Sequence, residues 1–242
     1  MISIRKIYKQ IISNIFKIYY GNLEVKNIKH FKKTFHVNKK NFYDFYEIKN
    51  CRMYTNTNDV AYILNNKILN GPSLQLRKNG KNSNILKNAA IDHGTPKKYS
   101  YLNKRIFSLL SGIDANYNYF HWFFDSLARF FLFKRFYKFK KDDYFLVQNY
   151  KNNFHKKSLK ILGIKNIINA YEQKHIKAKK IITVDFKRKN DDPPDWLIKD
   201  LRIFYKKKIN NEKKKINKEK KKIKIFINRT GNSSKFRDII NK

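Results

Sequence analysis

Apolar residues recur at helical spacing over the first twenty positions of the chain. One side of a helix drawn through residues 2–20 carries Ile4, Ile7, Tyr8, Ile11, Ile12, Ile15 and Ile18. Lysines lie between these positions, so the pattern predicts a basic amphipathic helix. We expect its apolar side to pack on its own domain, with binding to a membrane surface as the alternative.

No apolar run in the sequence approaches the roughly 20 residues that cross a bilayer, so no transmembrane helix is predicted. A signal peptide is not indicated either. Ser13, Asn14 and Lys17 interrupt the first apolar stretch, and no small-residue cleavage site follows it.

Residues 41–110 show short apolar runs separated by turn-forming residues, a pattern typical of strands. Turns are predicted at Asn65-Asn66 and at Asn70-Gly71-Pro72. Strands are predicted over Ser73–Arg77 and, most clearly, over Arg105–Leu110.

Helices and strands alternate after this point, beginning with a polar turn through residues 111–116. The predicted elements are a long aromatic helix over 119–138, a buried strand over 144–148, a helix over 153–162 closed by Gly163, and a strand over 180–184. Alternation of this kind implies a parallel sheet covered by helices. We therefore expect an α/β fold.

The last third of the chain changes in composition. Asp191-Asp192-Pro193-Pro194 predicts the start of a helix that runs to about Tyr205. The expected organisation is a helical lead over 1–45, an α/β domain over 46–205, a Lys-rich linker over 206–222 and the start of a second domain over 223–242. A strand with one helix start cannot bury its own apolar face. These residues therefore either pack back on the first domain or begin a second domain that is truncated, and we expect the second.

Composition indicates that the chain folds. Of the 242 residues, 41% are hydrophobic and 16% aromatic, which is unlike a disordered basic tail. Cys51 is the one cysteine, so neither an intramolecular disulfide nor a cysteine-based zinc cluster is available. The scarcity of cysteine indicates that the chain works in a reducing compartment.

The formal net charge of +38 first raises nucleic acid as a partner. The chain has 46 Lys but only 10 Arg, together with 30 Asn and 31 Ile, and all three abundant types have codons rich in A and T. Base composition alone therefore explains much of the charge, and a nucleic-acid binder would favour Arg. A non-enzymatic basic module that binds nucleic acid or an anionic membrane stays open as an alternative.

Three polar residues interrupt the predicted aromatic helix at a regular interval. His121, Asp125 and Arg129 are four residues apart, which places them in one row on a helix. Asp125 is positioned to accept hydrogen bonds from both neighbours, and an imidazole oriented in this way can act as a general base. The alternative is that the three residues only satisfy one another. His155 and His175 lie in Lys-rich surroundings and are expected to face solvent.

The segment from Asn116 to Arg129 resembles the signature of family 61 glycosyltransferases of the capsular polysaccharide type, which reads roughly Asn-Tyr-x-His-Trp-x-x-Asp-x-x-x-Arg. Leu159 to Ile164 is similar to the family's Leu-x-x-Leu-Gly-Ile. Lys224 to Arg229 resembles its strand ending in Tyr-Ile-Ser-Arg, and Arg237 to Asn241 its Arg-x-Ile-x-Asn. The resemblance covers roughly 105–241.

This resemblance implies two Rossmann-like domains that face each other across a cleft, the glycosyltransferase B-type fold. It implies inverting transfer from a nucleotide sugar to a glycan acceptor, with no metal and no further cofactor, in polysaccharide or cell-surface glycan synthesis. His121 and Asp125 would be catalytic, and Arg229 and Arg237 would bind the donor. The supporting or acceptor-side residues would be Asn118, Tyr119, Trp122 and Arg129.

The family's second domain carries a His-Gly-Ala-Gly-like loop that this sequence lacks. We therefore expect weak or no transfer by this chain alone, in the cytoplasm or at the inner face of the membrane. A degenerate glycan-binding scaffold is the remaining alternative.

Overall fold

The computed structural model of the chain describes residues 4–20, 23–27, 31–55, 59–73, 88, 98–111, 113–186 and 192–213. The chain divides into two compact units, residues 1–203 and residues 204–242. The described strands all belong to the first unit, and the last described helix crosses the boundary between the two.

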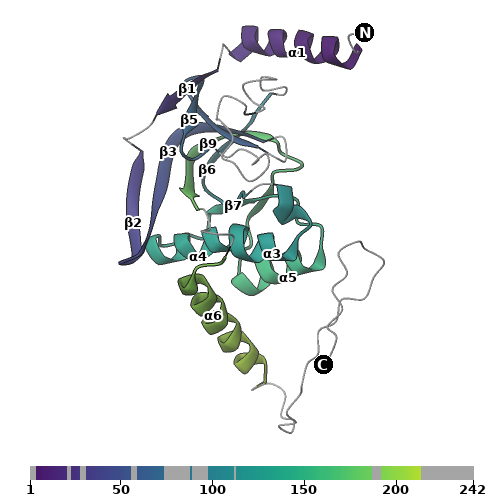
Figure 1. The fold of residues 1–242 in the computed structure, drawn as a ribbon. Coiled ribbons are helices and arrows are strands. Elements are labelled where there is room, and N and C mark those ends of the chain that lie inside the picture. The colour runs from purple at the N-terminus through teal and green to yellow at the C-terminus, as the bar shows by residue number, and fades with distance from the viewer. Residues whose placement is uncertain are drawn as a thin grey trace, which may run out of the picture. The chain divides into compact units, whose positions relative to one another are not determined.

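Helices and strands of the described residues are shown in Figure 1. The helices are α1 (Ile4–Tyr20), η2 (Ile113–Asn116), α3 (Tyr119–His121), η3 (Trp122–Ser126), α4 (Leu127–Phe136), α5 (Asn153–Leu162) and α6 (Asp195–Lys213). The strands are β1 (Glu24–Asn27), β2 (Lys32–Asn38), β3 (Asn41–Thr55), β4 (Val60–Leu64), β5 (Lys67–Asn70), β6 (Ser100–Ser108), β7 (Tyr144–Val147), β8 (Ile167–Asn169) and β9 (His175–Asp185).

The strands of the described residues form one mixed sheet of nine strands, in the order β1-β5-β4-β3-β9-β6-β7-β8, with β2 paired to β3. The predicted parallel arrangement is confirmed in the second half of the chain, where β9, β6, β7 and β8 run parallel. A long antiparallel pairing of β3 with β9, from Asp44 opposite Asp185 to Tyr54 opposite His175, joins this half to the antiparallel strands. The sheet is therefore mixed.

Two elements that are predicted from local sequence signals, helix 153–162 and the Asn65-Asn66 turn, are confirmed. Helix α5 spans the predicted residues, and Gly163 ends it in the left-handed conformation with φ +75°. Asn65 and Asn66 both adopt positive φ in the turn between β4 and β5. By contrast, β3 is one strand of 15 residues rather than several short ones. The expected strand over Ser73–Arg77 lies outside the described residues after Ser73.

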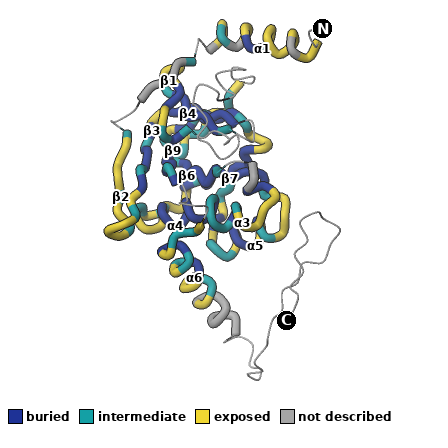
Figure 2. The backbone as a smooth tube through the Cα atoms, in the orientation of Figure 1, coloured by how far each residue is buried: buried dark blue, intermediate teal, exposed yellow. Residues whose placement is uncertain are grey.

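Two different apolar layers lie on the two faces of the sheet. Phe45, Phe107 and Phe145 point from β3, β6 and β7 toward α4, and the Phe107 and Phe133 ring centroids are 5.2 Å apart. The neighbouring residues on the same strands point the opposite way, because side chains alternate along a strand. They join a cluster that includes Ile48, Met53, Ile106, Leu146 and Ile181. Figure 2 shows long buried stretches in the central strands, among them the last five residues of β3 and the last three of β6.

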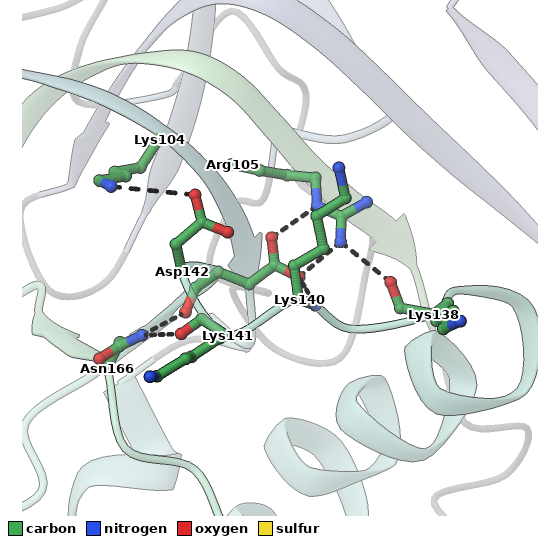
Figure 3. A network of polar contacts seen from close by, with 8 residues as sticks. Lys104, Arg105, Lys138, Lys140, Lys141, Asp142 and Asn166 are labelled. Carbon is green, nitrogen blue, oxygen red and sulfur yellow. Dashed lines mark hydrogen bonds and ion pairs between the residues drawn. The ribbon is translucent and has the colours of Figure 1, made fainter.

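A partly buried charge pair between Arg105 and Asp143 fixes the connection from α4 to β7, and Figure 3 shows the polar network around Arg105. Arg105 Nε donates to Asp143 Oδ1 at 2.7 Å, and its Nη2 donates to the backbone oxygen of Lys138 at 3.0 Å. The same carboxylate accepts from the Lys140 backbone N–H at 2.6 Å. Asn166 Nδ2 donates to the backbone oxygen of Asp143. Because Asp143 precedes β7, this network holds the amino end of that strand.

The predicted domain boundaries at residues 45 and 205 both fall within elements of the structure. Strands β1 and β2 and the first residues of β3 lie within 1–45, so the sheet begins before residue 46. Helix α6 continues to Lys213, inside the Lys-rich segment 206–222. Residues 223–242 lie outside the described residues. Within the described ranges, every helix is too short or too polar to cross a bilayer.

Candidate active site

The aromatic helix predicted over 119–138 is built from three consecutive helical geometries. Asn118 Oδ1 caps α3 by accepting from the Phe120 backbone N–H at 2.9 Å. The next turn, η3, is a π-helix, in which the Leu127 N–H bonds to the oxygen of Trp122 five residues earlier. Helix α4 then continues to Phe136, where Tyr137 turns extended with φ −130°. The regular helix that we predicted is thus interrupted and ends two residues early.

His121 and Asp125 are brought together by this π-helical turn. His121 Nδ1 lies 2.7 Å from Asp125 Oδ2. The two side chains are 29% and 18% exposed, so solvent and small molecules reach them. With Nδ1 donating its proton to the carboxylate, the ring carries its lone pair on Nε2, which is the form that a general base requires.

Arg129 does not complete the row in the predicted way. Its Nη1 donates to the backbone oxygen of Asp125 at 2.7 Å, and Nη2 donates to the backbone oxygen of Phe186 at 3.3 Å. The side chain is 2% exposed. Burial lowers the pKa of the guanidinium from its ordinary value, although the nearby charge of Asp125 acts in the opposite direction. Arg129 is therefore a positioning residue that ties the helix to the end of β9.

Trp122 and Ser126 point inward from the same turn and anchor it. Trp122 is fully buried, and its indole Nε1 donates to Ser158 Oγ on α5 at 2.8 Å. Ser126 Oγ lies 2.6 Å from Ser111 Oγ, just after the end of β6. These inward contacts fix how far His121 is rotated about the helix axis.

Polar groups that the sequence reasoning missed hold the loop before α3. Asn116 Oδ1 accepts from the Asn149 backbone N–H at 2.9 Å, and Asn152 Nδ2 donates to the backbone oxygen of Asn116 at 3.3 Å. His155 Nε2 donates to the backbone oxygen of Ala115 at 3.0 Å. Because Asn116 follows β6 and Asn149 follows β7, the site sits at the carboxyl ends of parallel strands, where α/β folds bind ligands.

The expectation that His155 and His175 face solvent is wrong. His155 is 0% exposed and packs against the Trp122 ring at a centroid distance of 4.4 Å. His175 is 4% exposed, beside Arg52 and edge-on to Tyr54. On α5, His155 shares its side with Ser158 and Leu159, which are buried with it. That spacing of three and four residues is the signal that could have identified it.

Exposed aromatic residues precede His121 in the chain, and the Phe120 ring packs edge-on to the His121 imidazole at 5.7 Å. Tyr117 is 70% exposed and Tyr119 is 59% exposed. The Tyr119 ring packs on Phe123 at 4.4 Å and on Phe154 of α5 at 5.4 Å, so its position is defined. A ring held in this way offers an apolar face and a hydroxyl at the rim of the site.

Positive charge gathers at the same end of the sheet. Lys151, after β7, and Lys174, before β9, both lie over the ring of Tyr171, at 5.6 Å and 5.4 Å. Tyr171 itself follows the carboxyl end of β8. Two ammonium groups at this edge favour the approach of an anionic substrate.

Two predicted donor-binding residues lie outside the described part of the chain, and the groove on the described surface is lined by other residues. Arg229 and Arg237 lie outside the described residues. Within the described ranges, no cluster of three or more His, Cys, Asp or Glu residues is arranged to hold a metal ion. A groove of about 580 Å³ between the β2–β3 turn and α6 includes Arg135 and Trp196 but none of the residues predicted for the site.

Comparison with known proteins identifies the region that carries this geometry. The family model for glycosyltransferase 61 matches residues 119–242, more than half of the 242-residue chain, and its match begins at the first residue of α3. No curated protein and no solved structure matches the chain. The chain therefore belongs to the glycosyltransferase 61 family, and it is an enzyme of the sugar-transferring class.

Proposed function

We propose that this glycosyltransferase moves a sugar from a nucleotide-sugar donor to a hydroxyl of a glycan acceptor, with inversion at the anomeric carbon. The observation that carries the proposal is the 2.7 Å contact between His121 Nδ1 and Asp125 Oδ2 in a partly exposed pair. The pair lies within the matched family region and at the carboxyl ends of β6 and β7.

In the proposed step, His121 Nε2 takes the proton of the acceptor hydroxyl as its oxygen attacks the anomeric carbon. The bond from that carbon to the diphosphate oxygen breaks on the opposite side, and the nucleoside diphosphate leaves with the electron pair. Asp125 stabilises the imidazolium that forms and keeps the ring in the required orientation. A single displacement of this kind inverts the configuration.

Each remaining acceptor-side residue has a distinct proposed role. Tyr119 would present its ring and hydroxyl to the acceptor, because it is exposed on the short helix that carries His121. Asn118 starts the helix that carries His121, and Trp122 and Arg129 hold that helix from its buried side. We class Asn118, Trp122 and Arg129 as positioning residues.

The donor side of the proposal comes from the family. Arg229 and Arg237 would bind the diphosphate through charge-assisted hydrogen bonds and neutralise the leaving group. Residues 223–242 would begin the donor-side domain of a two-domain B-type arrangement, and the reaction would need no metal ion. Lys151 and Lys174 support an anionic substrate at this edge. The product would be a capsular or other cell-surface polysaccharide.

Incubation with a panel of nucleotide sugars and glycan acceptors tests the proposal, with release of nucleoside diphosphate and the anomeric configuration of the product as readouts. His121→Ala should lower the transfer rate about 10²- to 10⁴-fold, the range for loss of a general base, and should leave donor binding intact. Asp125→Asn should lower the rate less. Arg229→Ala should weaken donor binding instead.

The matched control is His36→Ala, since His36 is an exposed histidine on β2. Full transfer by the His121 variant, or an equal loss in the His36 variant, would contradict the assignment. Retained anomeric configuration would refute the single displacement. Loss of transfer on chelation of divalent cations would refute metal independence.

A further inference from the structure

Helix α1 exposes a continuous apolar side, and Figure 2 shows most of the helix in yellow. Ile4 and Ile18, near its two ends, are 85% and 84% exposed, and Tyr19 is 80% exposed. The exposed apolar residues of α1 are Ile4, Ile7, Tyr8, Ile11, Ile15, Ile18 and Tyr19. Isolated exposed apolar residues are ordinary, but a continuous stripe marks a binding surface.

Among the residues of α1 whose side chains are described, Ser13 is buried, Ile12 and Lys17 are half-buried, and the others are exposed. Ser13 is 2% exposed, while Ile11 and Ile15 are 53% and 44% exposed. At about 100° per residue, Ser13 lies opposite these two isoleucines on the helix. A helix packed on its own domain would bury its isoleucines and expose its serine. The expectation that α1 packs its apolar side on its own domain is therefore wrong.

Charge indicates what covers this surface. Arg5, Lys6, Lys9 and Lys17 lie on α1, which contains no Asp or Glu. Because the chain carries a net charge of +38, a second copy would be repelled by like charge at close approach. An anionic surface is attracted, and basic residues beside an anionic leaflet each favour binding.

We propose that α1 is an interfacial helix that lies flat on an anionic lipid bilayer, with its isoleucine side in the headgroup region. A large apolar stripe, a basic remainder and no acidic residue are the properties of such helices. Its 17 residues would cover about 25 Å of surface at 1.5 Å per residue. This inference does not depend on the reaction proposed for His121.

Co-sedimentation of the full chain with lipid vesicles tests it. We expect binding to phosphatidylcholine vesicles that contain about 30% phosphatidylglycerol, and much weaker binding to pure phosphatidylcholine, because the basic residues need an anionic surface. The triple variant Ile7→Ser, Ile11→Ser and Ile15→Ser keeps every charge. It should lose at least about 100-fold in affinity, since three large apolar side chains no longer enter the headgroup region.

The matched control removes three exposed apolar side chains elsewhere. Phe42, Tyr101 and Ile203 are 60%, 56% and 66% exposed on β3, β6 and α6. The triple serine variant at these positions should bind anionic vesicles as the unaltered chain does. Equal binding by the α1 variant would overturn the proposal and assign binding to the overall charge. No binding by the unaltered chain would also overturn it.

A spectroscopic variant reports the depth of α1 directly. The native tryptophans, Trp122 and Trp196, are 0% and 4% exposed, so both already emit from a buried environment. Ile11→Trp adds an exposed indole, whose emission should shift to the blue on anionic vesicles and be quenched by brominated lipid. A shift that appears on self-association without lipid would identify a second copy as the occupant and refute the bilayer.

Discussion

The charge pair between Arg105 and Asp143 makes a quantitative prediction about the connection that leads from the site helix back to the sheet. The Asp143 side chain is 2% exposed and the Arg105 side chain is 23% exposed. Hydrogen bonding to Asp143 raises the pKa of Arg105 above its ordinary value, while burial acts against this. Arg105→Ala leaves the buried carboxylate with the hydrogen bond that it accepts from the Lys140 backbone N–H.

The expected cost follows from that geometry. Removal of one partner of a buried ion pair costs about 3–5 kcal/mol. Because Arg105 is partly exposed, water can reach the vacated space, so we place the loss of unfolding free energy near the lower end, at about 3 kcal/mol. The neighbouring pair Lys104–Asp142 provides the control. Its atoms are 3.8 Å apart and its side chains are 42% and 67% exposed, so Lys104→Ala should cost less than about 1 kcal/mol.

Urea unfolding followed by tryptophan fluorescence measures both changes. A double-mutant cycle with Asp143→Ala should give a coupling energy of about 2 kcal/mol or more, and the cycle for Lys104 and Asp142 should give about 0.5 kcal/mol or less. High salt should remove the second coupling and leave most of the first, because exposed pairs are screened more strongly. Equal couplings for the two pairs would refute the reasoning from burial.

The remaining predictions concern a buried histidine of α5 and two glycines with positive φ. Burial lowers the pKa of His155, so the unfolded chain binds the proton more readily and the free energy of unfolding should fall as pH drops below about 6.5. In unfolding measured between pH 8 and 5, His155→Gln should flatten this slope, whereas His36→Gln should not. Gly163→Ala should cost about 1 kcal/mol in the same assay, because φ is +75° but the space around it is open. Gly71→Ala should cost more, since its φ is +103° and a methyl group there would clash with Tyr46.

The sequence predicts best those elements whose signals are local. Helix α5 and its end at Gly163 follow from apolar spacing and from a residue that tolerates positive φ. The pairing of β3 with β9 joins residues more than 100 positions apart, and no local pattern encodes it. A mixed sheet with this central antiparallel pair was therefore not predictable from alternating helices and strands alone.

The site shows the same division. The four-residue spacing of His121 and Asp125 predicts their contact, which the structure contains. The spacing to Arg129 is identical, yet that side chain turns into the core and bonds a backbone oxygen. Sequence spacing shows which residues share a side of a helix. How deeply each side chain is buried depends on the other elements that pack against that side. His155 was missed because the lysines next to it in the sequence conceal the buried stripe to which it belongs.

The π-helical turn at η3 makes the site sensitive to chain length as well as to residue type. An α-helical turn closes with one residue fewer than this turn contains. Deletion of Phe123 or Phe124 would allow α3 and α4 to join as one α-helix, in which the residues now numbered His121 and Asp125 would stand three positions apart instead of four. Such a deletion would remove none of the polar side chains of the row, and yet it would change the spacing that sets the contact between His121 Nδ1 and Asp125 Oδ2. The geometry of the candidate pair therefore depends on the number of residues in η3 as well as on their identity.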